Sequence, residues 1–251
     1  DYRKTDFSHM RTGIMAGSGC PPELMRRAAR EDEMHMVGIT SVYGQTEASP
    51  GCTMSSTDDS IEVRVGTVGR PLPEIECKII DPETGKECPD GVTGEFVARG
   101  YNIMKGYYKN PELTAEVIDA DGWFHTGDLG FIDKDGYITL TGRKKDMIVL
   151  KNGKKAFPEE IEMLIARIPG VADCFVYGEP IDGDYTDLRI ALEVQYDEKI
   201  CRETYGDIPS SELKEKIWTQ VKEINATIPH YKRVTDLYIT TEPFIKTTSL
   251  K

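Results

Sequence analysis

The sequence lacks the features that mark several large classes of protein. No apolar run approaches the roughly 18 residues that a membrane-spanning helix needs. Basic residues are in the minority, with 31 Lys and Arg against 43 Asp and Glu and a net charge of -12. That sign opposes binding to nucleic acid or to anionic membranes through overall charge. We therefore expect no nucleic-acid partner and no transmembrane segment.

Paired cysteines and the usual start of a chain are also missing. The 6 cysteines are scattered, none forms a CxxC pair, and no histidine stands at zinc-like spacing. This pattern predicts a reduced chain without a structural metal, in the cytoplasm. The first residues contain neither an initiator Met nor the apolar segment of a signal peptide, so we expect the sequence to begin inside a longer protein.

Two common nucleotide-binding motifs are absent as well. The turn Gly17-Ser18-Gly19 is not a GxGxxG motif because residue 22 is Pro, and no GxxxxGK[ST] occurs. By itself this turn is typical of a structural feature. The length of 251 residues and a 39% hydrophobic content are sufficient for a sizeable core, which excludes a peptide-sized module.

The order of apolar runs and turn signals predicts three parts. Strand, glycine turn, helix (24–36) and strand (36–42) are typical of an α/β layer, and a polar loop (46–60) follows. Short β-prone runs then predict an antiparallel sheet or small barrel. The last part predicts a small α+β domain, with a helix begun by Pro158 and another capped by Ser210 or Ser211. The expected boundaries are 1–64, 65–143 and 144–251.

Five short motifs occur in a fixed order along the chain. They are YGQTE (43–47), GEFVARG (94–100), GWFHTGDLG (122–130), GRKKD (142–146) and KTTSLK (246–251). Each one alone recurs by chance, but five in order do not. Together they resemble the superfamily of AMP-forming acyl-CoA synthetases, adenylation domains and luciferases, and most closely the fatty-acyl-CoA ligases. The resemblance covers the whole chain.

The resemblance implies a reaction in two halves. A carboxylate, here a fatty acid, attacks the α-phosphate of ATP and gives acyl-adenylate and pyrophosphate. The thiol of CoA then displaces AMP. It also implies the fold: the end of an α/β nucleotide-binding layer, a β-rich (distorted barrel) subdomain and a mobile α+β C-terminal domain. ATP or AMP, Mg²⁺ and CoA are the expected cofactors and partners.

The resemblance assigns the nucleotide to three stretches of the chain. It implies that the turn Gly17, Ser18 and Gly19 lines adenine, that the face of Tyr43 meets the same base, and that Gly44 and Gln45 belong to this loop. The Thr46 hydroxyl is implied for the α-phosphate and the Glu47 carboxylate for Mg²⁺. Asp128 is implied to accept hydrogen bonds from the ribose diol, with Arg143 donating to the same ribose.

Further assignments concern the last third of the chain. Lys251 aligns with the lysine that bridges the attacking carboxylate and the α-phosphate, although Leu250 replaces the glycine usual before it. The resemblance implies that Lys145 takes the hinge position. The loop of Lys151, Asn152, Gly153 and Lys154 is implied to face CoA, and the alternative is an ordinary Asn-Gly hairpin turn.

The phosphate loop of the family and most of its acyl pocket have no counterpart in this sequence, so we expect them upstream. The chain by itself is then predicted to be incomplete for catalysis. Two alternatives remain open. One is an adenylating enzyme that loads a carrier protein or acts on another carboxylate. The other is an inert fragment that only binds a nucleotide.

Overall fold

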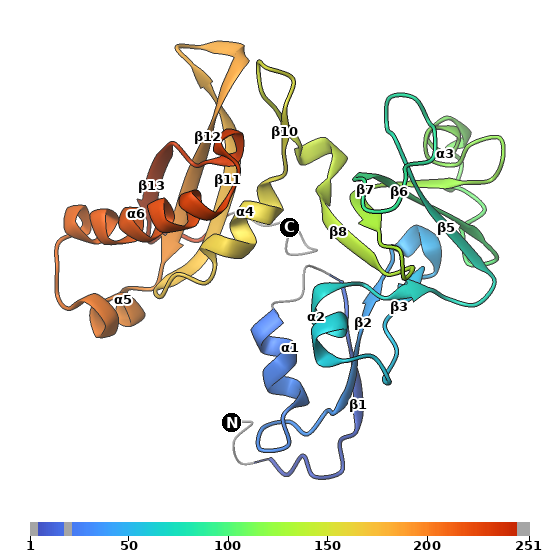
Figure 1. Ribbon diagram of the computed structural model, residues 1–251, viewed down its shortest axis with the longest axis horizontal. Helices are drawn as coiled ribbons and strands as arrows, with labels where there is room; N and C mark the ends of the chain where they lie inside the picture. The colour runs from blue at the N-terminus through green and yellow to red at the C-terminus, as the bar shows by residue number, and fades with distance from the viewer. Residues whose placement is uncertain (1–4, 18–21, 245–251) are drawn as a thin grey trace. The chain divides into compact units, whose positions relative to one another are not determined.

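The computed structural model describes residues 5–17 and 22–244, and the contacts divide the chain into two compact units, Asp1–Lys144 and Lys145–Lys251 (Figure 1). Each unit has its own sheets and its own buried apolar core. The expected class, α/β followed by α+β, is confirmed. The finer boundary at residue 64 stays a prediction.

The first unit begins with the expected α/β layer. Strand β1 (Thr12–Met15) runs parallel to β2 (Gly38–Tyr43), and α1 (Pro22–Ala29) lies between them in the chain. Buried Met25 and Ala28 of the helix pack against Ile39. Parallel pairing requires a crossover, and the amphipathic helix supplies it.

Helix α1 is shorter than the predicted 24–36. It ends at Ala29, and the chain then turns, with His35 in the left-handed region at a φ of 56°. The Met36 amide donates to the Ala28 carbonyl oxygen over 2.9 Å, which returns the chain toward β2. Arg30 follows the helix directly, and its guanidinium pairs with Asp32, while Arg27 of the helix pairs with Glu33. These ion pairs accompany the turn that ends the helix.

The predicted loop 46–60 contains regular structure. It holds the 3-10 turn η2 (Thr46–Ala48) and β3 (Thr53–Met54), which joins β2 and β4 (Arg70–Pro71) in the order β1-β2-β3-β4. The unpredicted helix α2 (Ile61–Gly66) follows, and the Ser60 hydroxyl oxygen caps it by accepting from the Val63 amide. The buried Arg64 Nη1 donates to the carbonyl oxygens of Val37 and Ile39, which ties α2 to β2.

A second sheet completes the first unit. Its four strands pair antiparallel in chain order: β5 (Ile75–Ile80), β6 (Gly94–Gly100), β7 (Phe124–Ile132) and β8 (Ile138–Arg143). Among the described residues this sheet is open, with β5 and β8 at its edges. Of the two predicted forms, an antiparallel sheet or a small barrel, the structure has the open sheet. Phe96 and Ile138 pack with Ala48 and Cys52, which links it to the first layer. The unpredicted helix α3 (Pro111–Val117) precedes β7.

The second unit is an α+β domain. Its hairpin and helices are β9 (Ile148–Val149), β10 (Lys155–Ala156), α4 (Pro158–Ile165), α5 (Glu198–Tyr205) and α6 (Ser210–Thr227). Its main sheet, in the order β11-β12-β13, consists of β11 (Val171–Ile181), β12 (Asp184–Tyr196) and β13 (Asp236–Thr240). Strand β12 runs antiparallel to β11 and parallel to β13. The helix α5 was not predicted.

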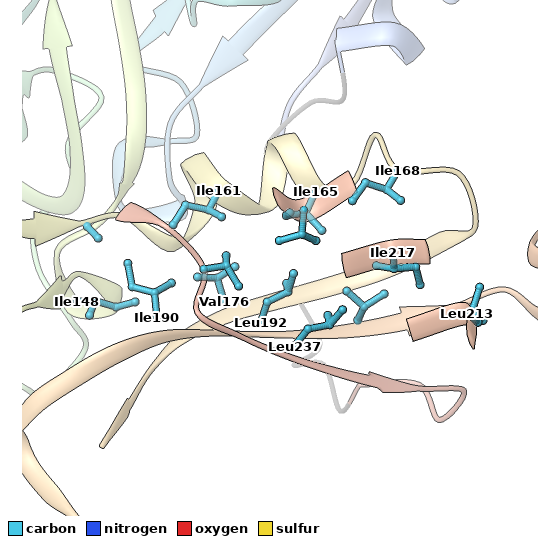
Figure 2. Packing of buried hydrophobic residues seen from close by; sticks show 14 of the residues in the cluster. Ile148, Ile161, Ile165, Ile168, Val176, Ile190, Leu192, Leu213, Ile217 and Leu237 are labelled. Atoms are coloured by element: carbon cyan, nitrogen blue, oxygen red, sulfur yellow. The ribbon is translucent and has the colours of Figure 1, made fainter. Parts of the chain in front are cut away.

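The core of this unit follows the predicted period of two. Ile190, Leu192 and Val194 of β12 are all buried, and Figure 2 shows isoleucines of α4 and α6 packed against this side of the sheet. The prediction that Ser210 or Ser211 caps α6 is wrong. The cap residue is Pro209, whose carbonyl oxygen accepts from the amides at 212 and 213, so both serines lie in the first turn.

None of the helices within the described ranges combines the length and the apolar character that crossing a bilayer requires.

Candidate functional site

The carboxylate of Asp128 is the centre of a polar network in the first unit. Asp128 on β7 lies directly opposite Arg143 on β8, and the Arg143 Nε is 3.2 Å from the Asp128 Oδ1. Only 6% of Asp128 is exposed. A charge this deeply buried needs opposite charge and hydrogen bonds to remain ionised. The cross-strand pairing therefore holds an anion and a cation together at one point of the sheet.

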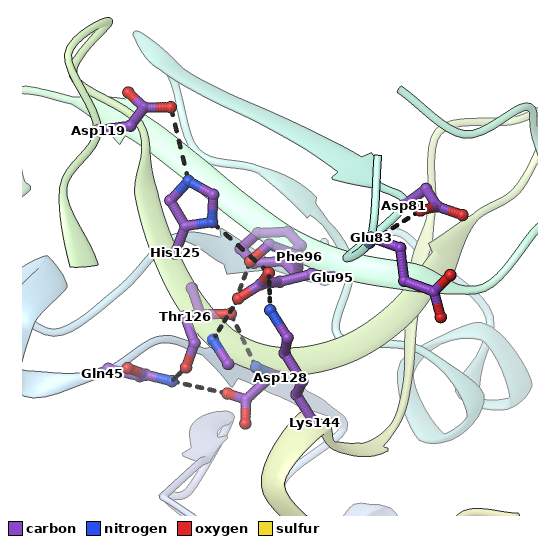
Figure 3. Close-up of polar contacts among 11 residues, drawn as sticks. Gln45, Asp81, Glu83, Glu95, Phe96, Asp119, His125, Thr126, Asp128 and Lys144 are labelled. Carbon is purple, nitrogen blue, oxygen red and sulfur yellow. Dashed lines mark hydrogen bonds and ion pairs between the residues drawn. The ribbon is translucent and has the colours of Figure 1, made fainter. Parts of the chain in front are cut away.

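Two side chains from the end of β2 and the loop after it complete this network. The Tyr43 hydroxyl donates to the Asp128 Oδ2 over 2.6 Å. The Gln45 Nε2 donates to the same oxygen over 2.8 Å (Figure 3). The Tyr43 ring packs edge-on against Phe96 at 5.2 Å between centroids. Burial, with the nearby Asp128 charge, raises the pKa of Tyr43 far above its ordinary range. The hydroxyl thus stays protonated and remains a donor.

These contacts limit what else the carboxylate can accept. Each carboxylate oxygen offers about two acceptor sites. Both sites on the Asp128 Oδ2 are used by Tyr43 and Gln45, whereas the Oδ1 contacts Arg143 alone among the described residues. One ribose hydroxyl can therefore bind the Oδ1 directly. A second hydroxyl at the Oδ2 requires Tyr43 or Gln45 to release its bond.

A bulge in β7 places Asp128 in this position. Val97 of β6 pairs with His125 and Glu95 pairs with Leu129, so three residues of β7 oppose one of β6. Gly127 lies in this bulge at a φ of 70°, where a side chain would be strained. The Thr126 hydroxyl donates to the Phe96 carbonyl oxygen and accepts from the Asp128 amide. The geometry of this bulge thus explains the sequence Thr126-Gly127-Asp128.

The loop that carries Thr46 and Glu47 is held from both sides. A Cβ on Gly44 would lie 1.8 Å from the Pro50 carbonyl oxygen, so only glycine fits there. The Asn102 Nδ2 donates to the carbonyl oxygens of Ala48 and Gly51 over 3.0 and 2.8 Å. The sharp return of the chain after β2 is therefore fixed by backbone contact and by a buried amide.

Glu47 has the character of a magnesium ligand. Its Oε1 accepts from the Tyr107 hydroxyl over 2.9 Å, while the Oε2 has no hydrogen bond within the described part of the chain. Burial and the contact with Glu47 raise the pKa of Tyr107. No group of three or more His, Cys, Asp or Glu in residues 5–17 and 22–244 could hold a metal by itself. Glu47 thus fits Mg²⁺ that takes its other ligands from phosphate oxygens and water.

The other residues that the sequence predicted for the site have no hydrogen bond or ion pair with the Asp128 network within the described part of the chain. Thr46 is exposed in η2, and Gly17 has a φ of 92°, which suits a turn. Ser18, Gly19 and Lys251 lie outside the described residues, and so does Leu250. Lys145 is the first residue of the second unit. Its assignment as a hinge stays a prediction.

The predicted CoA-facing residues form the hairpin between β9 and β10. Gly153 has a φ of 76°, and the Asn152 Oδ1 accepts from the Lys154 amide over 3.0 Å. The Lys151 Nζ is 2.7 Å from the Asp187 Oδ2, and the Lys154 Nζ lies 4.8 Å from the centroid of the Tyr231 ring. The four residues thus form a hairpin turn, and the assignment of this turn to CoA stays a prediction. The ammonium groups of Lys151 and Lys154 both belong to this turn.

Sequence reasoning missed four residues that support the site. Tyr107 contacts the Glu47 carboxylate, Asn102 holds the loop after Glu47, and Thr126 and Glu95 contact the bulge before Asp128. Thr126 and Glu95 belong to the quoted motifs, but their type and spacing do not show what they contact. Only the pairing of β6 with β7 brings them together.

Two family models match the chain in order. The AMP-binding enzyme model matches residues 1–108 and the AMP-binding enzyme C-terminal domain model matches residues 145–249. Among curated proteins, the putative acyl-CoA synthetase YngI of Bacillus subtilis (strain 168) is 47% identical over 180 residues, which are 72% of this chain and 32% of YngI. The mitochondrial medium-chain acyl-CoA ligase ACSF2 of Mus musculus is 39% identical over 178 residues, 71% of this chain and 28% of that protein.

Solved structures show the same fold. The anthranilate CoA ligase AuaEII in complex with anthranoyl-AMP has a TM-score of 0.79 at 27% identity and covers 100% of this chain and 44% of its own. ATP-bound MatB from Rhodopseudomonas palustris has a TM-score of 0.77 at 29% identity, with 96% and 43% covered. The chain spans about a third of the length of the curated relatives it matches.

Sequence motifs, the order of the two matching domains and the shared fold agree with one another. This chain belongs to the family of AMP-binding, adenylate-forming enzymes, and its curated relatives are acyl-CoA synthetases and ligases.

Proposed function

We propose that this chain is part of an ATP-dependent fatty-acid–CoA ligase. In the first half-reaction a carboxylate oxygen attacks the α-phosphorus of ATP, and pyrophosphate leaves with the electrons of the broken P–O bond. In the second, the sulfur of CoA attacks the acyl carbon and AMP leaves. The observation that carries the proposal is the buried Asp128 carboxylate with Arg143 directly opposite.

The network supports a site for the ribose of the nucleotide. The Asp128 Oδ1 accepts one ribose hydroxyl, while the Arg143 guanidinium, whose one ion pair among the described residues goes through Nε, donates to the other. Tyr43 and Gln45 hold the carboxylate in place before the nucleotide arrives. A group already fixed in its binding position loses little freedom on binding, which favours affinity.

Charge control at the phosphates is proposed for the next residues along the loop. Thr46 offers a hydroxyl to the α-phosphate, and Glu47 holds Mg²⁺, which offsets negative charge on the phosphates when bound. Lys251 is proposed to stabilise the charge that develops between the attacking carboxylate and the α-phosphate. Gly17, Ser18 and Gly19 are proposed to line adenine.

The second half-reaction is assigned to the second unit. We propose that Lys145 is the hinge about which this unit reorients, and that the β9–β10 hairpin with Lys151, Asn152, Gly153 and Lys154 then faces CoA. A hinge needs only a few residues that absorb a dihedral change. The Lys151 ammonium pairs with Asp187 and the Lys154 ammonium lies over the Tyr231 ring, so an anionic ligand on this turn would have to share or displace these contacts.

The acid is proposed as a fatty acid because one of the relatives is named a medium-chain acyl-CoA ligase. A structural neighbour at 27% identity carries anthranoyl-AMP, which favours another carboxylate as the second candidate. A cytoplasmic location remains our proposal, supported by five free cysteines among the described residues. Fractionation of the source cells tests it, since the mouse relative is named as mitochondrial.

Calorimetric titration of AMP into the chain tests the nucleotide site. We expect saturable binding. A folded sample that shows no saturable heat at millimolar AMP contradicts the proposal.

Exchange of pyrophosphate into ATP tests the acid, with fatty acids of graded length and anthranilate as substrates. Exchange that peaks at one fatty-acid length supports the proposal. Exchange with anthranilate alone would show that the substrate is another carboxylate and not a fatty acid. Acyl transfer to a phosphopantetheinyl carrier protein and none to CoA supports the carrier-loading alternative. If the chain alone shows no exchange, the same assays are run on a longer protein that contains this chain.

A further inference from the structure

A second buried carboxylate lies beside the Asp128 network. Glu95 on β6 is 3% exposed, and each of its two oxygens has a partner in the first unit (Figure 3). The Oε1 accepts from the Gly127 amide over 3.2 Å, and the Oε2 is 3.1 Å from the Lys144 Nζ. Nothing in the chemistry of the proposed reaction uses this group directly.

The Glu95 carboxylate gives the Gly127 amide an acceptor that the sheet itself does not provide. The bulge at residues 126–128 removes the Gly127 amide from the regular ladder between β6 and β7. Even a partly buried amide loses stability when it has no acceptor, and a carboxylate is a strong acceptor. The Glu95 side chain therefore replaces the lost ladder contact, one residue before Asp128.

The contact with Lys144 lies at the other side of the same network. Lys144 directly follows Arg143, the partner of Asp128, and it is the last residue of the first unit. His125 also contacts the Glu95 Oε2, at 3.5 Å from its Nδ1, while its Nε2 is 3.5 Å from the Asp119 Oδ2. The Lys144 ammonium is therefore the nearer of the two basic groups that contact the buried Glu95 carboxylate.

We propose that Glu95 is a positioning residue that fixes two segments at once. Its Oε1 holds the backbone before Asp128, and its Oε2 holds the residue after Arg143 and thereby the point where the first unit ends. One carboxylate thus sets the distance between the two groups assigned to the ribose. The nucleotide role of this arrangement rests on the proposed function, whereas the anchoring of the two segments does not.

Three variants separate the two contacts. Glu95→Gln keeps an oxygen that accepts from Gly127 but loses the charge that pairs with Lys144. Glu95→Ala loses both contacts. Lys144→Met loses the ion pair and leaves the Gly127 contact in place, and because it also removes the tryptic site at 144 it is read by Gly127 exchange and AMP affinity alone. The control is Glu76→Gln, which removes a carboxylate that pairs with Arg99 on the same sheet but is 61% exposed.

Two readouts are independent of any nucleotide. Amide hydrogen exchange at Gly127 reports its bond to Glu95. Tryptic cleavage after Lys144, measured relative to cleavage after Lys145, reports the ion pair, because trypsin must take the lysine side chain into its specificity pocket. We expect faster Gly127 exchange in Glu95→Ala alone. The cleavage ratio rises in both Glu95 variants, and neither readout changes in Glu76→Gln.

AMP affinity is the third readout. We expect Glu95→Ala to weaken AMP binding about tenfold and the glutamine variant less, since the latter keeps the bulge in place. Unchanged Gly127 exchange and an unchanged cleavage ratio in folded Glu95→Ala overturn the proposal, and if that variant does not fold, an unchanged ratio in Glu95→Gln does so. Failure of the wild-type chain to bind AMP overturns the proposed function alone, because the first two readouts still decide the anchoring.

Discussion

At the scale of single residues, the role proposed for Asp128 depends on its neighbours. An isolated carboxylate on a turn is an ordinary solvated group. Here the Asp128 carboxylate is 6% exposed, lies opposite Arg143 and accepts hydrogen bonds from Tyr43 and Gln45. The sequence predicted all four residues for the nucleotide. It did not predict that Tyr43 acts through its hydroxyl, because that contact joins β2 to β7 across 85 positions of the chain.

We expect Asp128→Asn to weaken AMP binding by about tenfold or more, since hydrogen bonds to a charged group are worth about 1.5–3 kcal/mol. The substitution removes the charge that pairs with Arg143 and leaves the shape of the side chain nearly unchanged. Calorimetric titration of AMP measures the effect. Asp32→Asn, which removes an exposed partner of Arg30 in the same unit, is the control and should bind AMP as the wild type does. Equal affinity in Asp128→Asn contradicts the ribose assignment.

Glu162 on α4 offers a residue-scale test of stability in the second unit. Its Oε1 accepts from the Val176 amide over 2.8 Å, and burial raises its pKa from 4.5 to about 7. The folded state therefore binds the proton more tightly than the unfolded state does, and stability falls as the pH rises from about 4.5 to about 7. Each pKa unit is worth about 1.4 kcal/mol, so the loss is roughly 3 kcal/mol.

Glu162→Gln keeps the acceptor for Val176 and cannot ionise. We expect it to match the wild type below about pH 4.5, where both states of the wild type are protonated, and to be more stable near pH 8. Thermal unfolding of the second unit at a series of pH values measures this difference. Glu223→Gln, on the exposed side of α6, should follow the wild-type pH dependence. A wild-type unit whose stability does not fall over this pH range contradicts the assignment.

At the scale of elements, the return of the chain after β2 determines where Thr46 and Glu47 lie. Gly44 faces the Pro50 carbonyl oxygen at a distance no side chain allows. We expect Gly44→Ala to destabilise the first unit by about 1–3 kcal/mol, the usual range for overpacking. Thermal unfolding of the first unit measures the loss.

Gly66→Ala is the matched control for this substitution. Gly66 ends α2, and a Cβ there meets no atom within 4 Å. Alanine favours helix over glycine, so this variant should be neutral or slightly stabilising. Equal effects of the two substitutions would show that the close approach at Gly44 is relieved by a small shift of the loop.

The predicted elements differ in accuracy for physical reasons. The strand with Ile190, Leu192 and Val194 follows from strict alternation, because these three residues share one buried face of β12, although Ala191 on the opposite face is buried as well. The short helices α2, α3 and α5 were missed. They have 6, 7 and 8 residues, too few for a clear helical period, and an N-cap side chain starts each of them.

At the scale of the whole molecule, the chain consists of two units with separate cores. The largest buried cluster lies entirely within the second unit, with Ile161, Ile165, Leu192 and Ile217 among its members. A unit with its own core and complete sheet has what independent folding requires. The break between Lys144 and Lys145 coincides with the position proposed as the hinge.

We therefore expect residues 145–251 to fold when produced alone. The fragment should unfold cooperatively, at the temperature at which the second unit unfolds within the complete chain. Differential scanning calorimetry of both samples makes the comparison, with the pH dependence of Glu162 as a signature that identifies the transition. A fragment without a cooperative transition would show that the second unit depends on the first.

The sequence by itself determined the family and the order of its two matching domains, and it supplied the residues that we propose for the nucleotide, because motifs and apolar periodicity are local features of the chain. The tertiary structure decided which groups touch. The pairing of β6, β7 and β8 sets Asp128 opposite Arg143 and places the Glu95 carboxylate between Gly127 and Lys144. Contacts between residues this far apart in the chain depend on strand register and on the bulge, and local sequence encodes neither of them.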